Sequence, residues 1–350
     1  MTAGDVQEDI HKRVGLVGRL FTLSGSARDE YFRGLPEGEY PDPVLSSLRP
    51  YVDDRAVCID VGANIGLYSL ALSILAPNGR IYAFEPSNDG FHFLQKNLAQ
   101  NQVKNVIVSQ MALGSSNQSL RFHEIPFFTA GSFATDDSCF LTSEILGSNY
   151  FEAPCTTLDE FVRSSGIDHI DLVKIDVEGA EMAVIEGALE TLEKFQPLVV
   201  LEFSSFALTL HLSTLPQVAL EKLQKVFPFL YVIGREDGRL MRLETGVQMY
   251  DFLYDNGIYG PVDNLLGSFT DLDIPRGYVR LAVLAAEARA AGEAAAKATL
   301  EAVEPTAGLR PAIPPPLSAS PAPVGLIIDA AKKTARKIGR RLATALQTRN

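Results

Sequence analysis

The sequence predicts an α/β domain, a doubly wound and mostly parallel sheet with helices on both faces. From residue 56 onward, short apolar runs alternate with helix-length segments, as in parallel strands joined by crossover helices. Two of these runs, Asp171–Asp176 and Leu198–Glu202, are apolar almost throughout, which is typical of strands buried on both faces. The other expected strands of the sheet are Val57–Val61, Arg80–Glu85 and Val106–Gln110.

The segments between these strands have helical character. Gly66–Ala76 is apolar, and the turn sequence Pro77-Asn78-Gly79 ends it. Phe91–Asn101 carries apolar residues at helical spacing. Beyond the fifth strand we expect short strands that pair antiparallel at one edge of the sheet, over residues 229–236, 238–244 and 249–256.

Charge is unevenly distributed along the chain. The formal net charge of -12 disfavours nucleic acid as a partner, because phosphates need a basic surface. Residues 281–350 hold 10 Lys/Arg and 5 Asp/Glu, a net charge of +5, which leaves -17 for residues 1–280. The sequence therefore predicts an acidic body with a basic tail.

The three cysteines match neither a disulfide framework nor a metal-binding spacing. We therefore expect no bound metal, a core position for Cys58 and a reducing, cytoplasmic setting. The polar start of the sequence lacks the apolar core of a signal peptide, and no charge-free run of about 20 apolar residues predicts a membrane span.

Five regions are expected along the chain. Residues 1–50 form an irregular and helical lead-in, or cap, to a main domain over residues 51–280. Residues 281–304 form an Ala-rich helix, residues 305–324 a Pro-rich linker, and residues 325–350 a basic amphipathic helix. Two roles stay open for that last helix: it lies on an anionic membrane, at the inner face, or it docks on the acidic body or on a partner protein.

A glycine loop, Asp60-Val61-Gly62-Ala63-Asn64-Ile65-Gly66, follows the first expected strand. Ligands of open α/β sheets bind beyond the carboxyl ends of the strands, where this loop is expected. Gly62 permits a tight turn and the close approach of a ligand, and Gly66 lets the next helix pack closely. Asp60 places a carboxylate at the mouth of the crevice.

The loop departs from the dinucleotide pattern G-x-G-x-x-G, because Asn64 stands where the second glycine admits a pyrophosphate. The Asp60 carboxylate would repel a pyrophosphate but suits a ligand with positive groups, such as S-adenosylmethionine (SAM), which carries an ammonium and a sulfonium. Glu85 ends the next strand, where a ribose-binding acid is expected. The alternative is that Glu85 is a solvated loop acid.

A third motif, Lys174-Ile175-Asp176-Val177-Glu178-Gly179-Ala180-Glu181, follows a strand and precedes a helix. It brings Asp176 and Glu178 to the sheet edge of Asp60 and Glu85, and four acids there need a cationic ligand or hydrogen-bond donors. Asp176 is expected to hold an ammonium, orient an acceptor hydroxyl or act as a base. Alternatively, Glu178 or Glu181 stabilises the helix N-terminus. Lys174 is expected to pair with one of these acids.

The segment Phe122–Ala153 interrupts the α/β alternation with aromatic residues and turn formers. We expect this aromatic insert to cover an acceptor pocket. A peripheral hairpin packed on the sheet is the alternative.

Together these motifs resemble the FkbM-type methyltransferases over roughly residues 50–255. Lys174–Glu181 is the most specific of them. In chain order the similarity comprises Asp60–Gly66 with Leu67-Tyr68-Ser69, Phe84-Glu85-Pro86, Met111-Ala112-Leu113-Gly114, Thr157-Leu158-Asp159 and Lys174–Glu181.

The resemblance implies a class I SAM-dependent methyltransferase fold, which is Rossmann-like and has a seven-stranded sheet with one reversed strand. It implies SAM as methyl donor and a hydroxyl of a glycan, glycolipid or secondary metabolite as acceptor. It places Asp176 and Glu178 at the reacting centre. Its cofactor residues are Asp60, Gly62, Asn64 and Gly66 on the methionine side, Glu85 at the ribose and the Ala112 region at the adenine.

Methyl transfer to a hydroxyl releases a proton, so a positioned base is expected to help. Asp176 is the first candidate for this base and Glu202, at the end of its strand, the second. Among the histidines only His123, in the aromatic insert, is a candidate. Two other function classes are a nicotinamide-dependent dehydrogenase, which Asn64 disfavours, and a non-catalytic SAM-binding or scaffold protein recruited by its basic tail.

Overall fold

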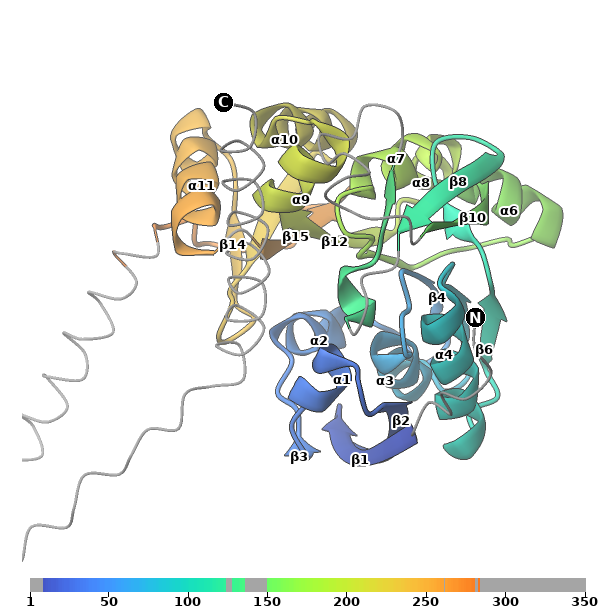
Figure 1. Ribbon diagram of the computed structural model, residues 1–350. Helices are drawn as coiled ribbons and strands as arrows, with labels where there is room; N and C mark the ends of the chain where they lie inside the picture. The colour runs from blue at the N-terminus through green and yellow to red at the C-terminus, as the bar shows by residue number, and fades with distance from the viewer. Residues whose placement is uncertain (1–8, 124–127, 136–149, 261, 281–282, 284–350) are drawn as a thin grey trace, which may run out of the picture.

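The computed structural model describes residues 9–123, 128–135, 150–260, 262–280 and 283. Its centre is an eight-stranded sheet with the strand order β14-β13-β15-β12-β11-β4-β5-β6 (Figure 1). The five neighbours from β12 to β6 all run parallel. They are the five strands predicted first, which confirms the α/β class: β4 (Val57–Val61), β5 (Arg80–Phe84), β6 (Val106–Ser109), β11 (Leu172–Ile175) and β12 (Leu198–Ser204).

Three strands extend the sheet beyond β12. β15 (Val262–Ser268) runs antiparallel between β12 and β13 (Phe229–Ile233). This gives seven strands with one reversed, as expected. β14 (Leu240–Arg242) pairs antiparallel with β13 and adds an eighth strand. The sheet therefore has eight strands, one more than the seven expected.

The strand predicted over residues 249–256 is wrong, because these residues belong to helix α11 (Gly246–Tyr259). Thr245 and Gln248 form a reciprocal capping box that starts the helix. Met249 and Phe252 are buried three residues apart, which is helical spacing. Strand β15 was not predicted, because the polar Asp263 and Asn264 interrupt its apolar pattern.

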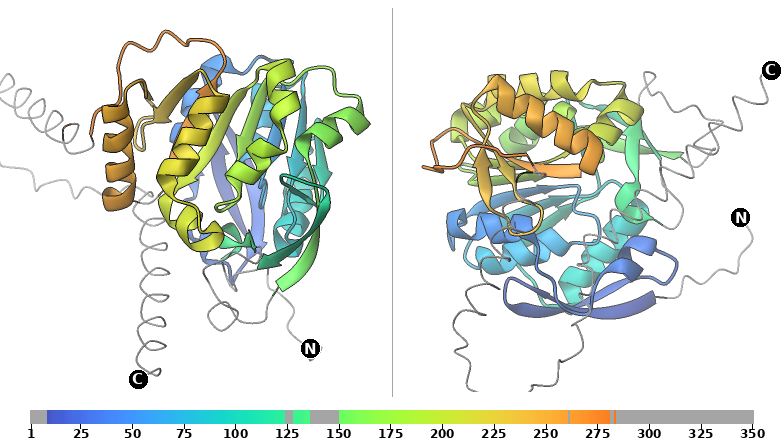
Figure 2. Two further views of the ribbon diagram at one scale, coloured as in Figure 1. Left: turned by 90° about the horizontal axis from the view of Figure 1, so that it is seen from above. Right: turned by 90° about the vertical axis from the view of Figure 1, so that its left-hand side faces the viewer.

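The helices cover both faces of the sheet (Figures 1 and 2). In β4 the side chains of Val57, Ile59 and Val61 join the core on one face, and Cys58 joins the core on the other, as strand alternation requires. The first face is covered by α6 (Leu158–Ser165), α7 (Glu181–Glu186), α8 (Leu189–Phe195), α9 (Ser205–Leu212), α10 (Pro216–Val226) and α11. The second face is covered by α2 (Pro43–Leu48), α3 (Leu67–Leu75) and α4 (Asn88–Gln100).

The N-terminal region begins with a β-hairpin, so the expected irregular and helical lead-in is wrong over its first part. β1 (Asp9–Leu16) and β2 (Arg19–Ser26) are joined by Val17 and Gly18, both with positive φ, as in a two-residue hairpin turn. The alternating apolar residues of both strands pack against α3 and α4. The remainder is short: α1 (Glu30–Gly34), β3 (Gly38–Glu39), α2 and the 3₁₀ turn η1 (Arg49–Tyr51).

The aromatic insert contributes to a second, four-stranded sheet with the order β7-β10-β8-β9. Residues 124–127 and 136–149 of this insert lie outside the described residues. The elements of this part are β7 (Ala112–Leu113), β8 (Gln118–His123), η2 (Thr129–Gly131), β9 (Phe133–Thr135) and β10 (Tyr150–Thr156).

The expectations for Cys58 and for the C-terminal region have different outcomes. Cys58 is fully buried in the core, as predicted, and burial raises the pKa of its thiol to about 12. The helix, linker and basic tail predicted beyond residue 283 lie outside the described residues. Among the residues with a described structure, no helix combines the length and apolar character needed to cross a membrane.

Asn97 on α4 ties the N-terminal hairpin to the main domain. Its amide oxygen accepts from the Ser24 amide at 2.7 Å, and its Nδ2 donates to the carbonyl oxygens of Ser24 and Ile65 at 3.1 and 2.8 Å. Asn97 is fully buried, so its loss leaves these backbone groups without a partner.

We expect Asn97→Ala to lower the free energy of unfolding by about 2–3 kcal/mol, because the buried backbone groups of Ser24 and Ile65 lose their hydrogen-bond partner. The matched control is Asn101→Ala, whose side chain contacts the same hairpin at Thr22 on the exposed surface and should cost less than about 1 kcal/mol. Urea unfolding measures both. Equal losses would mean that the hairpin is not held through Asn97.

Candidate active site

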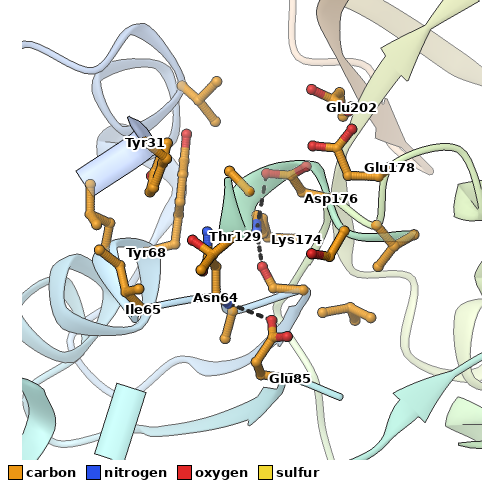
Figure 3. Close-up of a pocket in the computed structure, with 18 of the residues that line it drawn as sticks. Tyr31, Asn64, Ile65, Tyr68, Glu85, Thr129, Lys174, Asp176, Glu178 and Glu202 are labelled. Atoms are coloured by element: carbon orange, nitrogen blue, oxygen red, sulfur yellow. Dashed lines mark hydrogen bonds and ion pairs between the residues drawn. The ribbon is translucent and has the colours of Figure 1, made fainter. Parts of the chain in front are cut away.

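A cavity of about 730 Å³ opens at the carboxyl ends of the parallel strands (Figure 3). It lies beyond the end of β4, which pairs with β5 on one side and with β11 on the other. Open α/β sheets bind their ligands at this position, where the strand order reverses. Its volume is within the usual range for small-molecule sites. The lining includes most of the predicted site residues: Gly62, Asn64, Glu85, Ala112, Asp176, Glu178 and Glu202.

Gly62 is required by the close approach of two loops. Its φ is +76°, and a Cβ there would lie 1.8 Å from the carbonyl oxygen of Asp176. The missing side chain therefore makes room for the β11 loop, where we expected it to make room for a ligand. Gly66 has a φ of +96° and starts α3; a Cβ there would meet Leu94 of α4 at 2.8 Å. Gly66 lies outside the cavity lining.

Glu85 joins the ends of β4 and β5. One carboxylate oxygen accepts from the Asn64 amide at 2.7 Å and the other from the Ser87 amide at 2.9 Å. Burial raises the pKa of Glu85, and these hydrogen bonds partly offset that effect. Each carboxylate oxygen keeps a second lone pair, and Glu85 faces the cavity. It is thus a buried structural acid with acceptor capacity left for a ligand, and not a solvated loop acid.

Asn64 holds a left-handed backbone conformation with a φ of +48°. Its side-chain oxygen is buried and has no hydrogen-bond partner among the described residues. A buried polar atom without a partner is costly, so the wall of the cavity presents an acceptor that a ligand donor can satisfy.

Asp60 differs from the expectation that it stands at the mouth of the crevice. It is fully buried and does not line the cavity. One oxygen accepts from the Ser69 hydroxyl at 2.6 Å, and the other lies 3.3 Å from the Lys174 ammonium. Its role beside the methionine part of SAM stays a prediction, and the geometry favours an effect through Lys174 and the loop.

Lys174 is a buried cation at the centre of the site. Its ammonium lies between Asp60 and Asp176, 3.3 and 3.4 Å from their carboxylates, and donates to the Gly62 carbonyl at 3.0 Å. It also lies 4.9 Å from the centre of the Tyr68 ring. Burial alone would lower the pKa of Lys174, but the two carboxylates more than offset this and raise it. Lys174 therefore stays charged, and it pairs with two acids where we expected one.

Asp176, Glu178 and Glu202 form a carboxylate cluster on one wall of the cavity (Figure 3). One oxygen of each lies within 4.8 Å of the others. Burial, and then repulsion by neighbouring acids, raises the pKa of Glu178 and Glu202 well above the usual range. The carboxyl groups of Glu178 and Glu202 are therefore shifted toward their protonated forms. No metal was expected from the sequence, yet oxygens grouped in this way are ligands that a hard cation accepts.

Glu181, the first residue of α7, stabilises the turn before the helix, and neither Glu178 nor Glu181 caps the helix N-terminus through its side chain. Its Oε1 accepts from the amides of Val177 and Gly179 at 3.2 and 3.0 Å. This contact supports the turn in which Glu178 adopts a positive φ of 55°, a strained conformation for a residue with a side chain. Glu178 is thereby directed toward the cavity.

Two histidines flank this turn. His211 donates from Nδ1 to the Glu178 carbonyl at 2.7 Å and stacks on Phe133, with ring centres 3.7 Å apart. His123 stacks on Phe133 at 5.7 Å, and burial lowers the pKa of both histidines. His123 lies outside the cavity lining, so its candidacy as a base loses support. His211 was missed because no sequence motif marks it.

The aromatic insert and the N-terminal region together form the outer wall of the cavity. Phe122, Phe128 and Thr129 of the insert line the cavity. This position is compatible with the expected role of the insert as a cover, which stays a prediction. Asp29 accepts from the Thr129 amide and hydroxyl at 3.2 and 2.8 Å, which joins the two segments. The N-terminal residues of this wall were not predicted; they include Tyr31, Tyr40 and Asp42.

Strand order, the glycine loop after β4 and the acid after β5 define a class I SAM-dependent methyltransferase fold, whose cofactor is SAM. The model of the methyltransferase FkbM domain matches residues 60–224. This match lies within the region whose motifs resemble the FkbM-type methyltransferases, and it supports that resemblance.

Several curated relatives share this domain. Methyltransferase 1 of Beauveria bassiana is 29% identical over 152 residues, 40% of this chain and 61% of that protein. Hexuronic acid methyltransferase AglP of Haloferax volcanii is 27% identical over 157 residues, covering 45% and 60%. The 2-O-methyltransferase NoeI of Sinorhizobium fredii is 27% identical over 169 residues, covering 45% and 61%. The chain thus spans about three-fifths of the length of these relatives.

Among solved structures, the chain matches methyltransferase FkbM from Methylobacillus flagellatus KT. It has a TM-score of 0.37 and 16% identity, and the match covers 61% of this chain and 44% of that one.

We expect Lys174→Met to lower the free energy of unfolding by about 3–5 kcal/mol, because it leaves the buried Asp60 carboxylate without a countercharge. Adding Asp60→Asn should recover part of the loss, since the unpaired charge is then gone. Urea unfolding of the single and double variants measures this. A double variant no more stable than Lys174→Met would contradict the pairing.

Glu181 gives the domain a pH-dependent stability. Burial raises its pKa to about 7, above its value in an unfolded chain, so the folded state binds its proton more tightly. The stability from this proton is complete at acidic pH below the unfolded pKa and is lost as pH rises through about 7. Glu181→Gln should flatten this fall, worth about 1–3 kcal/mol, in unfolding measured from pH 5 to 8. Parallel curves for the two proteins would refute the assignment.

Proposed function

We propose that this chain transfers a methyl group from SAM to a hydroxyl oxygen of a glycan, glycolipid or secondary metabolite. The observation that carries the proposal is the carboxylate cluster of Asp176, Glu178 and Glu202, which shares one cavity with the glycine loop and Glu85. The names of two relatives support the acceptor class, since one acts on a hexuronic acid and one is a 2-O-methyltransferase.

The cavity fits SAM by its free acceptors. Glu85 keeps a lone pair on each oxygen for ribose hydroxyls, and the Asn64 side-chain oxygen lacks a partner among the described residues. Ala112 lies on the wall with Met111 and Leu113, which offer an apolar surface for adenine.

When bound, SAM supplies a methyl group on a sulfonium, which is activated before it meets the enzyme. The protein's residues have to orient the acceptor hydroxyl and take its proton. Burial and neighbouring acids raise the pKa of Glu178 and Glu202, which favours their protonated forms and a role as hydrogen-bond donors to acceptor oxygens. Asp176, whose charge Lys174 neutralises at 3.4 Å, is the base in this proposal. Asp176 therefore stays the first candidate for the base and Glu202 the second.

We expect Glu85→Gln to weaken SAM binding by about 10- to 100-fold, the loss for a hydrogen bond to a charged group. The control is Glu190→Gln, an exposed acid on α8, which should leave affinity unchanged. Isothermal titration calorimetry with SAM measures both. If the folded wild-type chain binds no SAM, the proposal fails.

Asp176→Asn should lower the rate of methyl transfer by about 10²–10⁴-fold, the contribution of a general base. Glu202→Gln mimics the protonated acid and should retain most activity near neutral pH. Radiolabelled methyl transfer to uronic acids, lipid-linked sugars and polyketide alcohols, with SAM affinity measured in parallel, separates chemistry from binding. A larger loss in Glu202→Gln than in Asp176→Asn would make Glu202 the base.

A further inference from the structure

Helix α11 carries a stripe of exposed apolar side chains on its outer side. Val247, Tyr250, Tyr254 and Ile258 are 71, 65, 49 and 62% exposed. Their spacing of three, four and four residues places them along one line of the helix. Large apolar side chains gathered in this way are typical of a contact surface, whereas single ones are ordinary.

The stripe lies on the face of α11 opposite the core. Met249, Phe252 and Asn256 of α11 are buried toward the sheet and α9, half a turn away from the stripe. The helix stands at the outer edge of the molecule (Figure 1). Within the described part of the chain, no element covers the stripe, as the exposed fractions of its side chains show.

The last described part of the chain runs directly to this helix. The Tyr278 hydroxyl donates to Asp255 of α11 at 2.9 Å. Two residues on, the Arg280 guanidinium lies 4.1 Å from the ring centre of Tyr254, a member of the stripe, and 3.9 Å from Asp251. The Val283 amide then donates to the Arg280 carbonyl. The following residues therefore start beside the stripe.

The sequence that follows is suited to cover it. On a helical projection of residues 284–303, the charged residues gather on one side, and the other side is mostly alanine. Small side chains allow a helix to approach another closely, and 20 helical residues span about 30 Å, more than the 14 of α11. The charged residues are Glu287, Arg289, Glu293, Lys297 and Glu301.

We propose that residues 284–303 of the same chain dock through their alanine face on the Val247–Ile258 stripe of α11. Arg280 is the anchor that directs the chain onto this surface. The docked segment shields Tyr250 and Tyr254 from water and makes the C-terminal region a continuation of the domain. The proposal is independent of the catalytic activity.

A single tryptophan in the full-length chain tests the docking, because the sequence contains no tryptophan. The reporter is Tyr250→Trp, read by emission wavelength and acrylamide quenching. We expect a blue-shifted, weakly quenched tryptophan. Adding Ala288→Glu and Ala295→Glu on the alanine face should raise quenching several-fold. Adding Ala290→Glu and Ala294→Glu on the charged side is the matched control and should change nothing.

Ile107→Trp, on exposed strand β6 at the far edge of the sheet, sets the value for a solvated tryptophan. Quenching of Tyr250→Trp equal to this value would overturn the proposal. Shielding that vanishes on dilution, together with a dimer in analytical ultracentrifugation, would also overturn it, because the occupant would then be a second copy. Shielding that is independent of concentration and lost only in the alanine-face variant supports docking within one chain.

Discussion

The site depends on one buried ammonium group. Lys174 lies on the central strand β11 and contacts Asp60 from β4, Asp176 after β11 and the carbonyl of Gly62. Two neighbouring segments, β4 with its glycine loop and β11 with the loop after it, are thus held together by one charge. Removal from water makes each of these charges costly alone, so the three groups are stable only together. This arrangement explains why the glycine loop and the β11 loop touch so closely that position 62 admits no Cβ.

Around this centre, the carboxyl groups differ in the charges and hydrogen-bond donors beside them. Asp176 has a cation beside it, whereas burial and neighbouring acids raise the pKa of Glu178 and Glu202. The Glu181 carboxyl group accepts hydrogen bonds from two backbone amides. Four carboxyl groups, three of them close together in the chain and one on the neighbouring strand, therefore differ by their surroundings alone.

The sequence predicted the parts of the fold that local pattern governs. The five parallel strands follow from apolar runs, and the glycine loop, Glu85 and the acids after β11 follow from their positions at strand ends. Strand β15 was not predicted, because Asp263 and Asn264 are held there by partners outside the strand. Asp263 contacts Arg235 and Asn256, and Asn264 pairs with Glu202. The sequence placed Asp60 at the crevice, since strand position does not reveal a buried lysine one strand away. Tyr31, Tyr40 and His211 reach the site through tertiary packing that no local motif records.

The link between Asp29 and Thr129 has a consequence for how specificity can evolve. The outer wall is built by two segments one hundred residues apart in the chain, and each is held in place by the other. An insert transplanted from a relative would arrive without its N-terminal counterpart and would lose its support. Under the proposed function this wall contacts the acceptor. A change of acceptor is then expected to require paired changes, and the two segments are expected to be exchanged as a unit in chimeric enzymes.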